Sequence, residues 1–200
     1  MADSVRLCIL GDEISLGVGD ERCLGWVGRV MSRVHRDIPI YTMPLGMPSA
    51  TSSTLLDNWE RECFPRFSNN SENKLAINLG VTDILAEISS TRSRLNLANL
   101  LDSISAYDID IFVIGPCPLP HVNTTALQEL SDGYKSVCER RNIQYVDTFT
   151  PLREHDQWIT DFNVGDGINP GQTGYGLLAW LILHYGWCQW MGSDSVPVEI

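Results

Sequence analysis

Three short segments of this chain carry carboxyl, hydroxyl and amide side chains of the kinds that do chemistry in proteins. The first is residues 11–17, Gly-Asp-Glu-Ile-Ser-Leu-Gly, which follows an apolar run. The second is residues 79–83, Leu-Gly-Val-Thr-Asp, and the third is residues 166–170, Asp-Gly-Ile-Asn-Pro. Paired carboxylates can act as general acid and base, and a single carboxylate can act as a nucleophile. The question is whether the fold brings these segments together.

Strand-like and helix-like patterns alternate along the whole chain. Apolar runs typical of buried strands cover residues 5–10, 38–43, 74–79, 109–114 and 143–147. Helical spacing of apolar residues covers residues 24–36, 51–64, 95–107, 127–141 and 171–190. Continuous apolar strands separated by helices predict a parallel sheet covered on both faces. We therefore expect an α/β fold, a three-layer α/β/α sandwich with a doubly wound, five-stranded, flavodoxin-like sheet.

The predicted topology places every polar segment on one rim. In doubly wound sheets, sites form beyond the carboxyl ends of the strands. Residues 11–17 follow the first strand, Gly46 follows the second, and residues 79–83 follow the third. Residues 116–118, Pro-Cys-Pro, follow the fourth, and residues 166–170 precede the last helix. These loops are expected to converge on one site.

Composition limits the class of protein. Two hundred residues suit one domain, which we expect to span residues 1–200 with a core over about 5–190 and a loosely held tail at 192–200. A net charge of −11 argues against nucleic acid as a partner, because phosphate binding needs clustered Lys and Arg. No apolar run is long enough to predict a membrane span, and no signal peptide is visible.

The six cysteines have no metal-ligand spacing, and we expect reduced, mostly buried thiols in a cytoplasmic protein. No metal and no cofactor are predicted. The last helix, over residues 171–190, is apolar on several sides, so the tail or a second subunit of a homodimer is expected to cover it.

In order and spacing, the three segments resemble the motif blocks of the SGNH (GDSL-type) hydrolases, over about residues 5–190. That family carries Gly-Asp-Ser in its first block, Gly-x-Asn-Asp in its third and Asp-x-x-His in its last. The resemblance puts Glu13 at the position of the nucleophilic Ser, Thr82 at that of the Asn and Asn169 at that of the basic His. It also implies that Asp166 is the orienting Asp and that Gly46 is the second-block Gly, a backbone donor to the oxyanion.

The resemblance therefore implies the family's fold without its serine chemistry. The favoured interpretation is a pseudoenzyme that binds a small molecule or a protein partner in the former active site. A first alternative is a repurposed enzyme, in which Glu13 pairs with Asp166 or Asp83 as acid and base, or attacks as a nucleophile. A second alternative is residual ester hydrolysis, with Ser15 as a displaced nucleophile or a recruited histidine as base.

The remaining candidates have structural interpretations that compete with functional ones. Asp12 and Ser15 are more typical of turn and first-turn hydrogen bonding, and Asp83 of helix capping or loop bracing. His121 and His155 lie in loops from which either could enter the site. Trp158, in the segment before the last block, is a candidate wall of a pocket.

Overall fold

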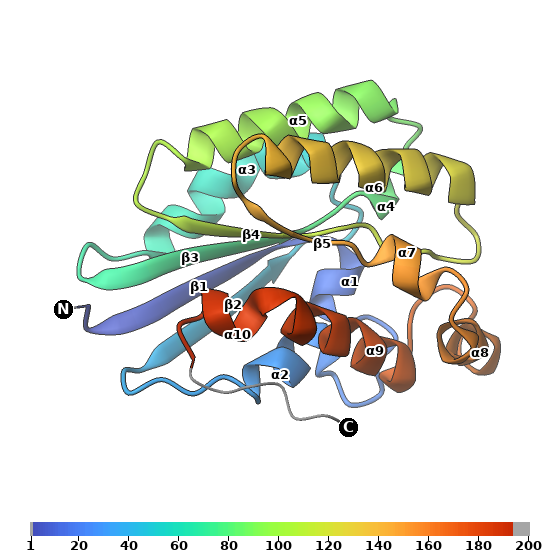
Figure 1. The fold of residues 1–200 in the computed structure, drawn as a ribbon, viewed down its shortest axis with the longest axis horizontal. Coiled ribbons are helices and arrows are strands. Elements are labelled where there is room, and N and C mark those ends of the chain that lie inside the picture. The colour runs from blue at the N-terminus through green and yellow to red at the C-terminus, as the bar shows by residue number, and fades with distance from the viewer. Residues whose placement is uncertain (1, 194–200) are drawn as a thin grey trace.

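The protein, as a computed structural model that describes residues 2–193, contains a parallel β-sheet between two layers of helices (Figure 1). The strands are β1 (Ser4–Gly11), β2 (Ile40–Gly46), β3 (Ser71–Asn78), β4 (Asp110–Ile114) and β5 (Gln144–Val146). Their order is β2-β1-β3-β4-β5, and every neighbouring pair is parallel. The predicted three-layer α/β/α sandwich with a five-stranded parallel sheet is confirmed.

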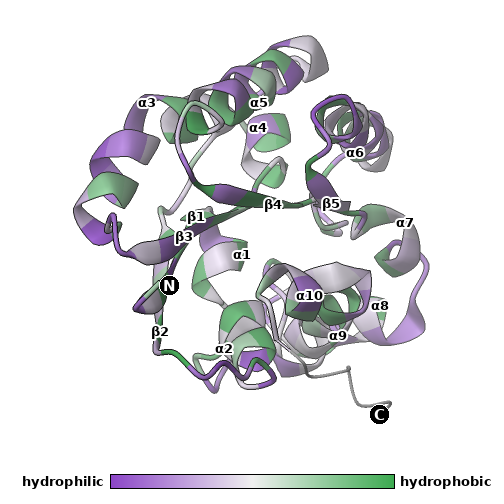
Figure 2. Ribbon diagram, turned by 60° about the vertical axis from the view of Figure 1, so that its left-hand side comes forward, coloured by the Kyte–Doolittle hydropathy of each residue, from purple (hydrophilic) through white to green (hydrophobic). Residues whose placement is uncertain are grey.

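Helices cover both faces of the sheet, as Figures 1 and 2 show from two directions. One layer contains α3 (Ser52–Cys63), α5 (Ser90–Ile104) and α6 (Thr124–Glu139), and the other contains α2 (Gly25–Met31) and α9 (Gln172–Ile182). The shorter elements are α1 (Glu13–Leu16), η1 (Phe64–Arg66), α4 (Val81–Leu85), α7 (Phe149–Leu152), α8 (Asp156–Val164), η2 (Leu183–Trp187) and α10 (Cys188–Trp190). No helix within residues 2–193 is long and apolar enough to span a membrane.

The hydrophobic core has two halves, one on each face of the sheet, and β1 contributes side chains to both. Leu7 and Ile9 pack in the cluster beneath α2 and α9, whereas Cys8 and Leu10 pack in the cluster beneath α3, α5 and α6. This alternation follows from the two-residue period of side chains along a strand, and it explains why β1 is apolar from Leu7 to Leu10. A strand buried on both faces holds the loop at its carboxyl end in a fixed position.

The last predicted helix, residues 171–190, is interrupted. Helix α9 ends at Ile182, a π-helical turn follows over Leu183–Trp187, and α10 resumes at Cys188. Within that turn Tyr185 has φ −95° and ψ 29°, and Gly186 has φ 101°. A positive φ costs glycine little, so Gly186 is where the helix breaks.

The expectation that Trp158 walls a pocket is wrong. Residues 156–164 form helix α8, and Trp158 is only 2% exposed within the core. Its indole Nε1 donates a hydrogen bond to the Pro118 carbonyl oxygen at 2.8 Å, and its ring meets Phe162 edge-on with centroids 5.3 Å apart. Trp158 therefore anchors the loop after β4 from within the core.

Two further helix boundaries differ from the predicted ones. The helix predicted over residues 24–36 ends at Met31, and the one predicted from residue 95 begins at Ser90. Ser89 caps the latter, because its side chain accepts a hydrogen bond from the Arg92 amide at 3.3 Å. The predicted tail lies mostly in residues 194–200, outside the described residues.

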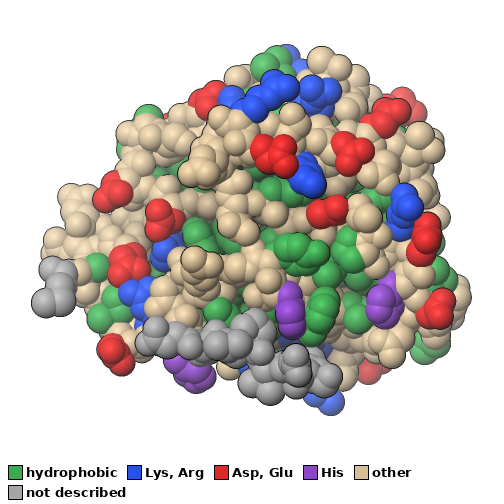
Figure 3. Space-filling view, viewed as in Figure 1, with side chains coloured by type: hydrophobic (Ala, Val, Ile, Leu, Met, Phe, Trp, Pro, Cys, Tyr) green, Lys and Arg blue, Asp and Glu red, His purple; other side chains and the backbone are tan. Residues whose placement is uncertain are grey.

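On the face shown in Figure 3, acidic and basic side chains are interspersed and hydrophobic side chains gather near the middle. Trp180 and Tyr185, from the C-terminal helical segment, are 40% and 48% exposed. A homodimer that covers this segment stays a prediction. All six cysteines are free thiols, and only Cys23 is exposed.

Candidate functional site

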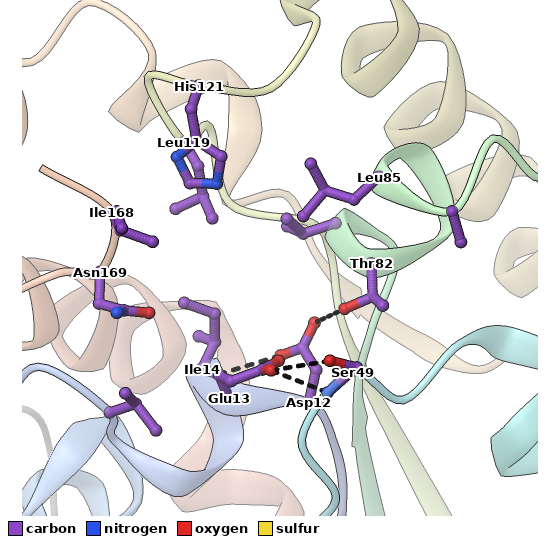
Figure 4. Close-up of a pocket in the computed structure, with 13 residues that line it drawn as sticks. Asp12, Glu13, Ile14, Ser49, Thr82, Leu85, Leu119, His121, Ile168 and Asn169 are labelled. Atoms are coloured by element: carbon purple, nitrogen blue, oxygen red, sulfur yellow. Dashed lines mark hydrogen bonds between the residues drawn. The ribbon is translucent and has the colours of Figure 1, made fainter.

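A pocket of about 430 Å³ lies beyond the carboxyl ends of the strands, within the size range of small-molecule sites (Figure 4). Its lining comes from the loops that follow β1, β2, β3 and β4 and from the loop before α9. The lining residues are Asp12, Glu13, Ile14, Val18, Ser49, Val81, Thr82, Leu85, Ala86, Leu119, His121, Ile168 and Asn169. The structure therefore brings together the five chain segments that the sequence placed on one rim.

Asp12 forms part of the pocket floor. It is 3% exposed and caps α1, because its Oδ1 accepts a hydrogen bond from the Ile14 amide at 3.0 Å. The hydroxyl of Thr82 donates to its Oδ2 at 3.2 Å. Burial, reinforced by the neighbouring Glu13 charge, raises the pKa of Asp12 from 3.8 to about 6 despite these hydrogen bonds. Thr82 thus contacts Asp12 at the base of the pocket.

Glu13 lies at the first position of α1 and turns its side chain toward the loop after β2 (Figure 4). Its Oε1 accepts the Ser49 amide at 2.8 Å and the Ser49 hydroxyl at 3.4 Å. No hydrogen bond reaches its Oε2 from the part of the chain that the structure describes. A backbone N–H that could hold a bound anion is therefore already occupied by a carboxylate of the chain itself.

Ser49 is a polar residue of the pocket that sequence reasoning missed. Its φ is 58°, a left-handed conformation that glycine adopts most easily, and its amide faces position 13. Gly46, the predicted oxyanion donor, ends β2 and does not line the pocket. A Cβ at Gly46 would lie 2.7 Å from Leu16 Cγ and 2.9 Å from the Asp12 carbonyl oxygen. A glycine at this position therefore allows β2 to pack closely against Leu16 and Asp12.

The last motif forms a compact turn around Asp166. Its Oδ1 accepts the Ile168 and Asn169 amides at 2.8 and 2.7 Å, and its Oδ2 accepts Nδ2 of Asn169 at 3.0 Å. The hydrogen bonds from Asn169, backbone first, and from Ile168 lower the pKa of Asp166. Asn169 lines the pocket, whereas Asp166 is exposed and outside the lining.

Asp83 and Ser15 have structural positions. Asp83 is fully buried, and it accepts the Ser52 amide at 2.7 Å and the Tyr134 hydroxyl at 3.3 Å, which ties α4 to α3 and α6. Ser15 is 2% exposed and packs against Gly11, where a Cβ would lie 2.0 Å from its Oγ. Ser15 does not line the pocket, so its hydroxyl is not presented to a ligand there.

Of the two loop histidines, the structure brings only one to the pocket. His121 stands on the wall opposite Asp12 and Glu13, beside Leu119 (Figure 4). His155 lies at the N-cap of α8, away from the lining, and its buried Nδ1 has no hydrogen-bond partner within residues 2–193. Of these two histidines, His121 is thus the one whose side chain a bound molecule could contact.

The loop that carries Val18 into the pocket wall is braced by Asp20. This carboxylate accepts the amides of Arg22, Leu24 and Gly25 and forms an ion pair with Arg29. Burial alone would raise its pKa, but the Arg29 guanidinium and the backbone donors outweigh burial and lower it to about 2. From the other side, Tyr175 Oη donates to the Val18 carbonyl oxygen at 2.8 Å.

Most of the lining is apolar, and its polar groups are two carboxyl groups, two hydroxyl groups, one amide and one imidazole. No three His, Cys, Asp or Glu side chains within residues 2–193 are grouped as a metal site would require. Ser49 supplies a hydroxyl in the pocket, but within residues 2–193 this hydroxyl donates to Glu13 and not to a histidine. These groups can donate and accept hydrogen bonds to a small molecule in an otherwise apolar pocket.

A known protein family and several solved structures are similar to this chain. Residues 9–177 match the model of the GDSL-like Lipase/Acylhydrolase family. The lipase/acylhydrolase from Enterococcus faecalis has a similar structure, with a TM-score of 0.73, 21% identity, and coverage of 98% of this chain and 100% of that one. No significant match is found among curated proteins.

Two further solved structures are similar. An acetylxylan esterase from Geobacillus stearothermophilus gives a TM-score of 0.74 at 17% identity, with both chains covered over 100% of their lengths. A member of the lipolytic protein G-D-S-L family from Veillonella parvula gives 0.74 at 20% identity, covering 89% of this chain and 96% of that one. At these identities the likeness shows the fold.

Proposed function

Because the chain belongs to the GDSL-like lipase/acylhydrolase family, we propose that it is a member from which the serine chemistry has been removed and whose pocket binds a small molecule. In this proposal Glu13 stands at the nucleophile position, Thr82 at the position of the Asn donor and Asn169 at that of the base. Asp166 keeps the role of orienting the side chain of residue 169. The backbone amide donor that the sequence assigned to Gly46, in the second block, is supplied by Ser49 instead.

One observation carries the proposal: the Ser49 amide donates to Glu13 Oε1 at 2.8 Å. Hydrolysis of an ester requires that amide donors stay free for the oxyanion that forms in the transition state. Here a permanent carboxylate takes the donor before any substrate arrives. The same carboxylate also replaces the hydroxyl that would attack.

The contacts do not favour Glu13 paired with Asp166 as acid and base. Asp166 is exposed, and both its oxygens accept hydrogen bonds within its own turn. Asp83, the other carboxylate considered for that pair, is fully buried beneath α3. The residual-hydrolase alternative draws support from His121 on the pocket wall and from the Ser49 hydroxyl.

We also propose that the chain works as a single domain in the cytoplasm. Six free thiols, five of them buried, fit a reducing compartment, where disulfides rarely persist. The occupant of the pocket is proposed to be a small molecule rather than a protein partner, because the site is concave and of small-molecule size.

Hydrolysis of a short aryl acetate by the native protein and by Glu13→Ala tests the proposal. We expect both proteins to stay at the rate of the buffer, because loss of the nucleophile or the base costs about 10⁴–10⁶ in rate in serine hydrolases. Saturable turnover by the native protein that Glu13→Ala abolishes would make Glu13 catalytic and overturn the proposal. Turnover abolished by Ser49→Ala or His121→Ala instead would favour the residual hydrolase.

A further inference from the structure

The charge of the pocket is one-sided. Two carboxyl groups, Asp12 and Glu13, lie at its floor, and the lining contains no Lys or Arg. His121 is the other titratable residue of the lining, and it stands across the pocket from both carboxyl groups (Figure 4). A bound anion would meet these carboxylates without a fixed cation to offset them.

One carboxylate oxygen in the pocket accepts no hydrogen bond from residues 2–193. Glu13 Oε1 is engaged by the Ser49 amide and hydroxyl, and both oxygens of Asp12 hold protein donors. Glu13 Oε2 accepts no hydrogen bond from residues 2–193, and Glu13 is a partly exposed residue of the pocket lining. A donor on a ligand would complete the hydrogen bonding of this carboxylate, and a charged donor would form the stronger bond.

The rest of the cavity suits a carbon skeleton. Ile14, Val81 and Leu119 are buried and form inner walls, while Leu85 and Ile168 are 54% and 56% exposed at its edge. Apolar surface this exposed in a concave site is stabilised when a ligand covers it. The pocket thus combines an acidic floor with apolar walls.

We propose that the pocket binds a small organic cation, a protonated amine on an alkyl or aromatic body, with the ammonium group on Glu13 Oε2. This ligand class rests on the proposed binding function. The amine lies over the floor near Glu13 and Asp12, and its carbon body lies against Ile14, Leu85 and Leu119. The Asn169 side-chain oxygen, whose amide nitrogen is held by Asp166, is a further acceptor at the wall.

Three probes of equal length test the ligand class: hexylammonium, hexanol and hexanoate, each titrated into the native protein at pH 7.5. Binding is followed by the NMR signals of the Ser49 backbone amide and the Asn169 side-chain amide. We expect hexylammonium to bind about tenfold or more tightly than hexanol, and hexanoate most weakly. Equal affinity for amine and alcohol, tighter binding of hexanoate, or no binding of any probe would each overturn the ligand class.

Two matched variants test whether the Glu13 carboxylate causes the preference for an amine. Glu13→Gln keeps an oxygen for the Ser49 amide but removes the carboxylate, and we expect it to bind hexylammonium and hexanol equally. Glu60→Gln removes one exposed carboxylate from α3, outside the pocket lining, and should keep the native preference. An amine preference that survives Glu13→Gln would contradict the assignment.

The two proposals fail in different ways. If amine and alcohol bind equally to a protein that does not hydrolyse aryl acetate, the ligand class is wrong and the loss of serine chemistry stands. If aryl acetate is turned over in a manner that depends on Glu13 while the amine preference holds, the proposed function is wrong and the cation site stands.

Discussion

The Glu13→Ser/Thr82→Asn/Asn169→His variant is expected to hydrolyse a short aryl acetate at least about 100-fold faster than the native protein. Shortening Glu13 to Ser releases the Ser49 amide, which then faces the position of an oxyanion. Asp166 already accepts a hydrogen bond from the side-chain nitrogen of residue 169 at 3.0 Å, the contact that orients a histidine base. The scaffold therefore retains what the three new side chains require.

The matched control is Glu13→Ser/Thr82→Asn, which leaves Asn169 in place. Without a base this double variant should stay near the native rate, so that the gain depends on the histidine. Circular dichroism establishes that each variant folds. A folded triple variant with no gain in rate would contradict the assignment of these positions.

Replacement of Asp12 by Asn is expected to raise the free energy of unfolding at pH 8 by up to about 3 kcal/mol. Burial places the pKa of Asp12 at about 6 in the folded protein, against 3.8 as its ordinary value. Asn keeps an oxygen for the Ile14 amide and offers its NH₂ to the Thr82 hydroxyl, so the cap and the floor contact survive. What the substitution removes is the cost of a buried charge.

The pH dependence has a definite sign. Between about pH 4 and 6 the unfolded chain has released a proton that folded Asp12 still holds, so the free energy of unfolding falls as the pH rises. Above pH 6 the buried charge of Asp12 lowers the free energy of unfolding by its full amount. Below about pH 4 this destabilisation is absent. Urea unfolding at pH 8 and pH 4 measures this, with the exposed Asp57→Asn on α3 as control. An equal effect of Asp12→Asn at both pH values would contradict the raised pKa.

The centre of the sheet was predictable because β1 and β3 are buried on both faces over most of their length. Continuous apolar character in residues 5–10 and 74–79 is a signal that packing enforces, and β1 and β3 lie there. The helix boundaries were less predictable, because capping and breaking depend on single residues. Gly186 marks the break in the last helix, yet the apolar residues on both sides of it read as one continuous helix.

The site was predictable to the level of its loops and less so at single residues. Motif spacing brought Glu13, Thr82 and Asn169 to one pocket. Ser49 was missed because a serine does not indicate a left-handed backbone conformation. The backbone donor of the second block was assigned to the nearby Gly46 instead. The direction of the Glu13 side chain, toward Ser49 rather than Asp166, follows from tertiary contacts that spacing along the chain does not encode.

The central claim, that no serine nucleophile remains, is tested most directly by covalent labelling. The native protein is incubated with an aryl fluorophosphonate, which phosphonylates activated serines with loss of fluoride, and its intact mass is measured. The account expects no gain in mass, because Glu13 replaces the hydroxyl, Ser15 is buried against Gly11, and no histidine within residues 2–193 is hydrogen-bonded to Ser49. A stoichiometric adduct that peptide mapping places on Ser15 or Ser49 would contradict it.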